Sequence, residues 1–196
     1  HFPVGGFLTL DLKDAVLCLG SMFLGPVFAP VMAALAALLE FLTVSGTGPY
    51  GLLMNFASSA AFSTVAALVY RYKRTLLGAV TALMSAVLSM TAVMMVMNLL
   101  ITPLYTGLSG SDVAAMIPSL LLPFNLIKGA LNASLTALLY KPVTVGLRRV
   151  LPGYGAANAR KPDKRSIVFA AVAAAVAALS LVLLFTVLRG SVKFGK

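Results

Sequence analysis

The chain has 196 residues, of which 60% are hydrophobic and 10% are charged. A soluble domain of this length carries about a quarter charged residues, so the composition argues against a soluble protein. The net charge of +10 does not indicate a nucleic-acid-binding protein, because the cations gather in short segments between uncharged apolar runs. The sequence therefore predicts an all-α integral membrane protein and no nucleic-acid partner.

Long apolar segments are predicted as helices, because about 20 apolar residues in one helix span a bilayer. The first apolar segment is interrupted by Gly25-Pro26. Proline lacks a backbone N–H and clashes with the preceding turn, so we expect a break there. We predict a loop at 1–6, helices at 14–24, 27–43, 51–72, 76–101, 118–140 and 166–188, and loops at 44–50, 102–117 and 141–165.

The basic residues predict the orientation of the chain in the membrane. Segments 71–74 and 141–165 are both cationic and are separated by two helices, so they lie on one side. Cationic loops face the cytoplasm. Segments 44–50 and 102–117 hold no cation and are expected to face outward. If 14–43 forms a hairpin, the N-terminal segment also faces outward, and three loops gather over one end of the bundle.

Common catalytic motifs are missing from the sequence. His1 is the sole histidine, so neither a histidine-based triad nor an HExxH zinc site is available. Cys18 is the sole cysteine and is expected to pack as a small apolar side chain. No GxxxxGK[ST] phosphate-binding motif occurs, so a partner is expected to supply energy. We expect no enzyme activity, no metal site and no cofactor.

Polar residues inside the predicted helices are the candidate functional groups, because such residues are costly in a bilayer. They are Glu40, Asn55, Asn98, Asn125 and Lys128. The predicted topology places the first four near the outward helix ends and the lysine one turn deeper. Lys128 cannot easily extend to water from this depth. We therefore expect it to contact a ligand or to form a buried pair within a binding pocket.

Alternative interpretations of the polar and aromatic residues stay open. Asn55 and Asn132 either bridge helices or contact a ligand. Glu40 either reaches the interface, pairs with the buried lysine or belongs to the site. Phe7 and Tyr105, in the outward loops, are either interfacial aromatics or stacking surfaces for a flat ligand.

Small residues recur every four positions at Ala29, Ala33 and Ala37. Such a face lets two helices approach closely in lipid. It either packs within the chain or forms a docking surface for a partner subunit.

Six segments, taken in order, resemble the riboflavin-specific S component of energy-coupling factor (ECF) transporters. They are FPVGGFLTLDLKDA (2–15), FLGP (23–26), GLLMNFASSAAF (51–62), YRYKRT (70–75), NLLITPLY (98–105) and LPFNLIKG (122–129). The resemblance extends from residue 1 to about residue 142. It implies a bundle of six helices, the first of which is missing here, so we expect an N-terminally truncated chain.

The resemblance implies a subunit in a bacterial plasma membrane that captures riboflavin from outside. It also implies partners: a transmembrane coupling protein and two ATPases. Carried over by position, Asn98, Asn125 and Lys128 are polar ligand contacts, and segment 7–11 is a lid. The lid residues expected to contact ligand are Phe7, Leu10 and Asp11. Riboflavin is then the transported substrate and not a cofactor. The alternatives are an S component for another vitamin or flavin analogue, and a membrane scaffold protein without transport activity.

The predicted organisation has three parts. Residues 1–142 form the S-component bundle, 143–165 a basic cytoplasmic linker, and 166–196 an additional transmembrane helix with its tail. Helix 166–188 has no counterpart in the resemblance. It would place the C-terminus outside, or it is an added anchor that does not touch the pocket.

Overall fold

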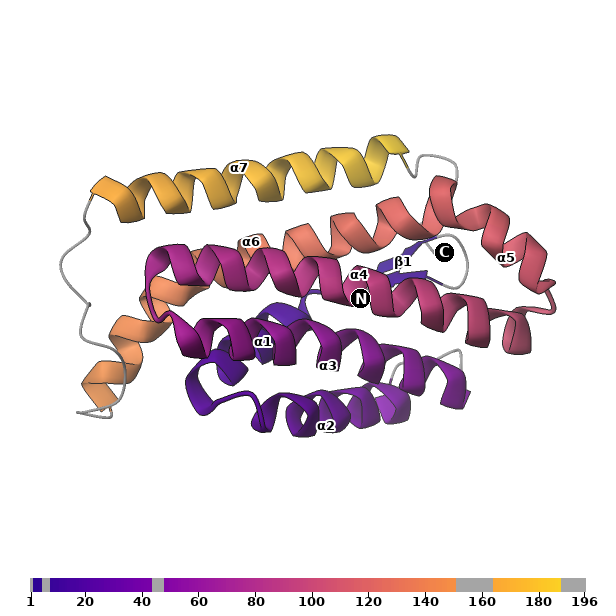
Figure 1. Cartoon of the computed structure of the whole chain (residues 1–196), viewed down its shortest axis with the longest axis horizontal. Coiled ribbons are helices and arrows are strands. Elements are labelled where there is room, and N and C mark those ends of the chain that lie inside the picture. Colours follow the sequence, from indigo (N-terminus) through magenta and orange to yellow (C-terminus); the bar gives the residue numbers. More distant parts are fainter. Residues whose placement is uncertain (1, 5–7, 44–47, 151–163, 188–196) are drawn as a thin grey trace.

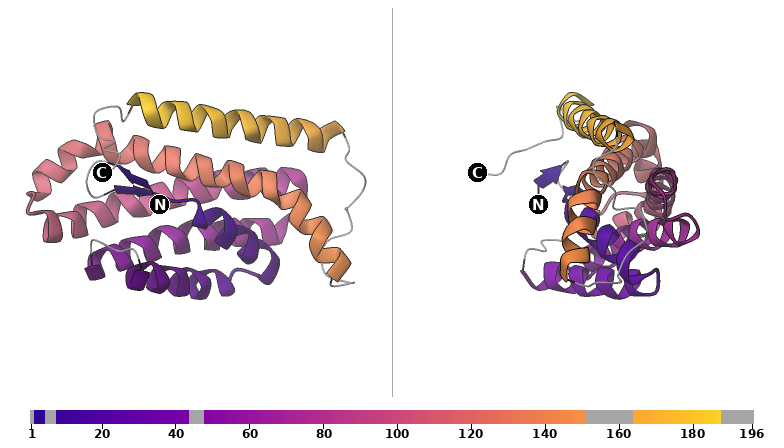
Figure 2. Two further views of the ribbon diagram at one scale, coloured as in Figure 1. Left: turned by 180° about the vertical axis from the view of Figure 1, so that it is seen from behind. Right: turned by 90° about the vertical axis from the view of Figure 1, so that its left-hand side faces the viewer.

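The computed structural model describes residues 2–4, 8–43, 48–150 and 164–187. Long helices lie side by side in one bundle, with a small β-hairpin on one side of it (Figure 1, Figure 2). The elements are β1 (Phe2–Val4), β2 (Leu8–Leu10), α1 (Lys13–Leu24), α2 (Phe28–Thr43), α3 (Gly48–Tyr72), α4 (Leu76–Thr106), α5 (Gly110–Met116), the π-helical turn η1 (Ile117–Leu121), α6 (Leu122–Val150) and α7 (Lys164–Val187). The predicted helical membrane-protein class is confirmed.

Several helices are long and apolar enough to cross a bilayer. Within the described residues these are Gly48–Tyr72, Leu76–Thr106, Gly110–Gly146 and Ile167–Thr186. Phe28–Thr43 is apolar but shorter. Helix α1 has 12 residues, which is too few to span a bilayer alone.

The predicted break between the first two helices is confirmed. Gly25 adopts a φ of 109°, a conformation that residues with a Cβ rarely adopt, and Pro26 follows it. The chain reverses there, so that α1 and α2 run side by side and both pack on α3 (Figure 1). The short helix α1 and the longer helix α2 thus form the hairpin that was assumed when the N-terminal segment was predicted to face outward.

Two segments predicted as loops, 102–117 and 141–165, contain helix in their described residues, so these predictions were wrong there. Helix α4 continues through Pro103 to Thr106, and α5 and η1 fill most of the rest of segment 102–117. Helix α6 does not end at Tyr140 but continues through Pro142 to Val150. Proline is tolerated inside membrane helices because neighbouring groups satisfy the freed carbonyl, whereas a helix end in lipid exposes several backbone groups.

The N-terminal segment, predicted as a loop, contains a short antiparallel hairpin. Phe2 lies opposite Leu10, and Val4 lies opposite Leu8. Leu8 and Leu10 are buried in an apolar cluster with residues of α5, η1, α6 and α7. The hairpin therefore places Leu8 and Leu10 against the bundle.

Close packing of small residues holds the first helices together. Ala29, Ala33 and Ala37 of α2 are fully buried within the chain, so the interpretation as internal packing is confirmed for this face. Cys18 is also fully buried, as expected for a packing residue.

Helices α4 and α6 approach closely at Gly129, where an added Cβ would lie 2.9 Å from a Val87 methyl group.

Helix α7 lies along α6 on the outside of the bundle (Figure 2). Ala173, Ser180 and Leu184 are buried, whereas most of its other apolar side chains are exposed. Leu184 belongs to the same apolar cluster as Leu8 and Leu10. The additional helix therefore contributes to the cluster beneath the hairpin.

Candidate ligand-binding site

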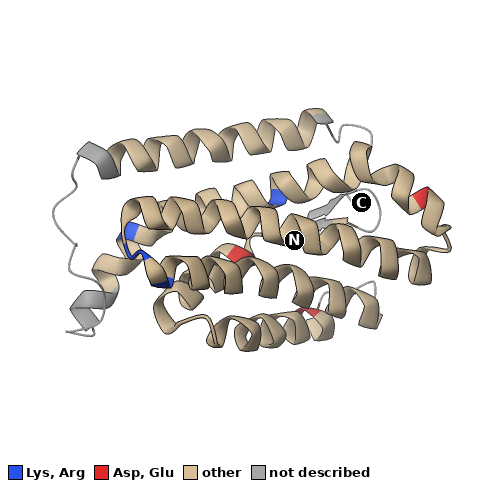
Figure 3. Cartoon of the chain, in the orientation of Figure 1, with Lys and Arg blue, Asp and Glu red and all other residues tan. Residues whose placement is uncertain are grey.

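Charged residues separate along the long axis of the bundle. Figure 3 shows basic residues where α3 meets α4 at one end, and an acidic residue in α5 at the opposite end. Between these ends Figure 3 also shows charged residues on the bundle's helices, and Asp14 and Lys128 among them are buried. These interior charges come from the start of α1 and from α2 and α6, and they form the candidate site.

An ion pair joins the N-terminal segment to α6. Lys128 Nζ donates to Asp11 Oδ2 at 3.0 Å, and each side chain is 6% exposed. The prediction of a buried pair for Lys128 is confirmed. Burial alone would raise the pKa of the Asp11 carboxyl, but the ammonium groups of Lys128 and Lys13 outweigh it and hold that pKa below its usual value.

Asn132 of α6 caps the N-terminus of α1 from outside that helix. Its Oδ1 accepts a hydrogen bond from the Ala15 backbone N–H at 3.0 Å. Its Nδ2 donates to the Asp11 carbonyl, also at 3.0 Å. The residue at the N-cap position, Leu12, provides no side-chain acceptor. Asn132 therefore satisfies a backbone donor that the helix leaves free, and its bridging interpretation is confirmed.

Glu40 forms a direct ion pair with Lys13, whereas Lys128 forms one with Asp11. Lys13 Nζ donates to Glu40 Oε2 and also lies 3.7 Å from Asp11 Oδ2. Asn55 Nδ2 donates to the same Glu40 oxygen at 2.8 Å. Asn55 thus bridges α3 and α2. Lys13 and Glu40 meet because both lie in the α1–α2 hairpin.

Asp14 was not predicted as a site residue, yet it is fully buried beside this network. Ser59 Oγ donates to Asp14 Oδ1 at 2.5 Å. Asp14 Oδ2 and Asp11 Oδ1 are buried and accept no hydrogen bond from any residue that the structure describes. The available signal was three charged residues within segment 11–14, immediately before a long apolar run.

Asn98 and Asn125 are buried on α4 and α6, which pack together. Each Nδ2 donates to the carbonyl four residues earlier in its own helix, Met94 at 2.7 Å and Leu121 at 2.8 Å. Within the described residues, no direct hydrogen bond links either amide to Lys128. Their joint role as ligand contacts stays a prediction.

Of the predicted aromatic and apolar ligand contacts, the structure describes Tyr105 and Leu10. Tyr105 stacks on Tyr50, with ring centroids 5.7 Å apart and planes inclined by 21°. Its hydroxyl lies 3.7 Å from the sulfur of Met54. Leu10, in strand β2 of the hairpin, is buried. Phe7 lies outside the described residues.

Comparison with known proteins places the chain in a family. Residues 1–140 match the family model of the ECF transporter, substrate-specific component. The chain belongs to this family. The S component shares 33% identity over 150 residues with the riboflavin transporter RibU of Staphylococcus aureus (strain TCH60), covering 74% of this chain and 79% of the relative. It shares 26% identity over 153 residues with the riboflavin transporter FmnP of Bacillus subtilis (strain 168), covering 71% and 80%.

A solved structure also resembles this S component. It is described as the S component of a bacterial ECF transporter, and it superposes with a TM-score of 0.63 at 30% identity. The match covers 74% of this chain and 83% of the solved one. The predicted family and fold are therefore confirmed, and the family is one of transporter subunits and not of enzymes. Helix α7 lies beyond the range that the family model matches.

Proposed function

We propose that this S component captures riboflavin from outside a bacterial cell and delivers it through the plasma membrane. A transmembrane coupling protein and two ATPases would supply the energy, since the sequence holds no phosphate-binding GxxxxGK[ST] motif of its own. Two relatives named riboflavin transporters support this choice of substrate. Riboflavin is the cargo in this proposal and not a cofactor.

The observation that carries the proposal is the set of buried polar atoms around Lys128. Asp11 Oδ1 and Asp14 Oδ2 have no hydrogen-bond donor among the described residues. A buried acceptor without a donor costs about 1–3 kcal/mol. Riboflavin carries several donors, the imide N–H and the ribityl hydroxyls, and its flat tricycle suits apolar walls such as Leu10.

The N-terminal segment would act as a lid over this site. The Asp11–Lys128 pair and the bonds of Asn132 attach the segment to α6. The basic α3–α4 junction is expected to face the cytoplasm. The hairpin lies away from that junction (Figure 1), which would place the site toward the outer surface.

The extent of the family match and the end of α6 support the division of the chain into a bundle, a basic linker and an additional helix. The family match ends at residue 140, close to the proposed bundle boundary at 142. Helix α6 continues to Val150, so the basic segment 143–165 begins as helix. Residues 166–196 would add a membrane anchor on the α6 face of the bundle.

Riboflavin fluorescence tests the substrate. Purified protein in detergent should quench riboflavin fluorescence with one ligand per chain. Flavin mononucleotide and thiamine serve as competitors that separate a riboflavin site from a site for another flavin or vitamin. Riboflavin fluorescence that stays unchanged when the protein is added would contradict the proposal. So would a site that thiamine occupies as readily as riboflavin does.

Two substitutions test the predicted contacts. Asn125→Ala and Lys128→Ala should each weaken riboflavin binding by about 1 kcal/mol or more, about fivefold in Kd, because each leaves a buried ligand group unpaired. Thr91→Val is the control, because Thr91 is a buried polar residue of α4 outside the predicted site. Unchanged Kd in both alanine variants would remove these residues from the site.

A further inference from the structure

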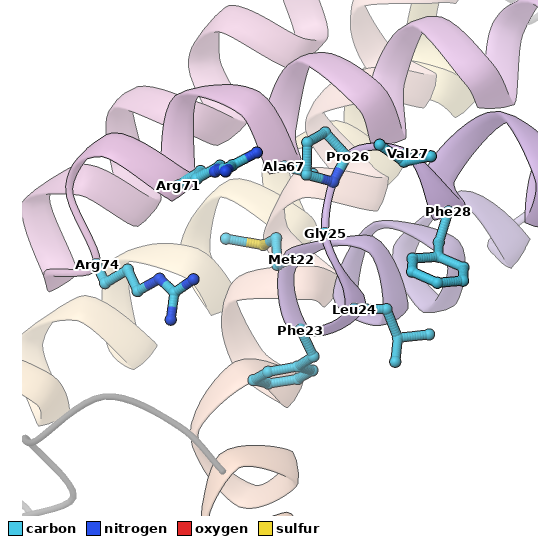
Figure 4. Close-up of a pocket in the computed structure, with 10 residues that line it drawn as sticks. All are labelled: Met22, Phe23, Leu24, Gly25, Pro26, Val27, Phe28, Ala67, Arg71 and Arg74. Atoms are coloured by element: carbon cyan, nitrogen blue, oxygen red, sulfur yellow. The ribbon is translucent and has the colours of Figure 1, made fainter.

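A cavity of about 290 Å³ lies where the α1–α2 turn meets the end of α3 (Figure 4). It is separate from the Asp11–Lys128 network. Its lining residues are Met22, Phe23, Leu24, Gly25, Pro26, Val27, Phe28, Ala67, Arg71 and Arg74. Most of the wall is apolar, and the two arginines are its charged groups. The proposed vitamin site uses none of these residues.

The cavity is electrostatically suited to an anion. Arg71 and Arg74 extend toward the α1–α2 turn (Figure 4). None of the acidic residues that the structure describes lines the cavity. Val27 and Phe28 stand at the N-terminus of α2, whose first turn holds no acidic side chain. The positive end of the helix dipole therefore adds to the two guanidinium groups.

The rim of the cavity is suited to hydrocarbon. Leu24, Val27 and Phe28 are 51%, 75% and 52% exposed. They adjoin the basic α3–α4 junction of a multi-pass membrane protein, where apolar side chains meet lipid and cations meet head groups. Arg71 and Arg74 are exposed and lie beside exposed apolar side chains, a combination that favours a molecule with an anionic group and an apolar tail. A free phosphate ion would make no use of that rim.

We propose that this cavity binds one anionic phospholipid. Arg71 and Arg74 would contact the phosphodiester, since guanidinium groups match phosphate oxygens in shape and charge. The acyl chains would lie along Leu24, Val27 and Phe28. The bound lipid would then connect the α1–α2 turn to the end of α3.

Native mass spectrometry of the full chain tests the proposal with phosphatidylglycerol and phosphatidylcholine as probes. Wild-type protein should retain one phosphatidylglycerol and should not retain phosphatidylcholine comparably. The double variant Arg71→Gln/Arg74→Gln should retain phosphatidylglycerol about tenfold less, a loss of about 1.4 kcal/mol. Lys73→Gln is the matched control, because this exposed cation lies between the arginines and does not line the cavity. It should retain the lipid as wild type does.

Equal retention by the double variant and Lys73→Gln would overturn the proposal, as would equal retention of the two lipids. Displacement of the lipid by millimolar inorganic phosphate would show a simple anion site and would also overturn it. Loss of assembly with a coupling protein at unchanged lipid retention would identify a protein contact instead. Gel filtration and thermal unfolding check the fold. If the double variant does not fold, Arg74→Gln replaces it, because Arg74 lies outside any helix.

Discussion

Replacing Lys128 by methionine would leave the Asp11 carboxylate buried without its closest cation. Removing one partner of a buried ion pair costs about 3–5 kcal/mol of folding free energy. Lys13 Nζ remains 3.7 Å from Asp11 Oδ2 and still offsets part of the charge. We therefore expect the lower end of the range, about 3 kcal/mol. The double variant Asp11→Asn/Lys128→Met removes both charges and should recover at least about 2 kcal/mol of that loss.

Unfolding by sodium dodecyl sulfate in mixed micelles measures these free energies. The titration is done without riboflavin, so that a ligand-binding role of Lys128 does not contribute. Lys73→Met is the matched control, because Lys73 is exposed and its replacement should change stability by less than about 0.5 kcal/mol. A loss below about 1 kcal/mol for Lys128→Met would refute the reasoning. The reasoning would also be refuted if the double variant lost as much unfolding free energy as Asp11→Asn and Lys128→Met lose together.

The pH dependence gives a second readout of the same pair. The pKa of Asp11 in the folded protein lies below its usual value, because the neighbouring ammonium groups outweigh burial. Such a carboxyl contributes stability above its unfolded pKa of about 4, and the contribution is lost as pH falls through the lower folded pKa. In the wild-type protein, the contribution of the Asp11 carboxylate to folding stability should therefore be constant between about pH 5 and pH 8. Without Lys128, burial favours the protonated carboxyl, so the deficit of Lys128→Met should shrink toward acidic pH. A deficit that grows toward acidic pH would contradict this account.

Three further substitutions test the packing around the site, all by the same unfolding titration. Asn132→Ala should cost about 2 kcal/mol, because it leaves the buried Ala15 N–H without its acceptor; a loss below about 0.5 kcal/mol would contradict the capping role. Gly129→Ala should cost about 1–3 kcal/mol, because its Cβ would lie 2.9 Å from a Val87 methyl group. In the same helix, Gly146→Ala meets no atom within 4 Å and should be neutral or stabilising by up to about 1 kcal/mol; equal effects of the two would show that α4 and α6 pack less closely than described.

The sequence correctly marked Lys128 as a group needing a buried partner, because its distance from both helix ends prevents contact with water. It also indicated Asn132 as a possible helix bridge. It did not identify the partner of Lys128, and it kept Glu40 as a candidate. Asp11 and Lys128 are 117 positions apart, and no local pattern encodes which of several distant carboxylates will be nearest.

Proline does not mark a helix end at every position of this chain. Pro103 and Pro142 both lie inside helices, whereas Pro26 follows a true break. The difference at the break is Gly25, whose positive φ lets the chain reverse direction. No glycine precedes Pro103 or Pro142, and α4 and α6 continue through them.

The membrane class, the approximate helix positions and the separation of charged segments follow from the sequence itself. Each of these depends on the cost of transferring a side chain into lipid, which is a property of that side chain and its near neighbours. Tertiary packing alone decided that Asp11 meets Lys128, that Asn132 caps α1, and that the N-terminal segment pairs as a hairpin. These contacts join groups distant in the chain, and each forms because the packed helices remove both partners from water together.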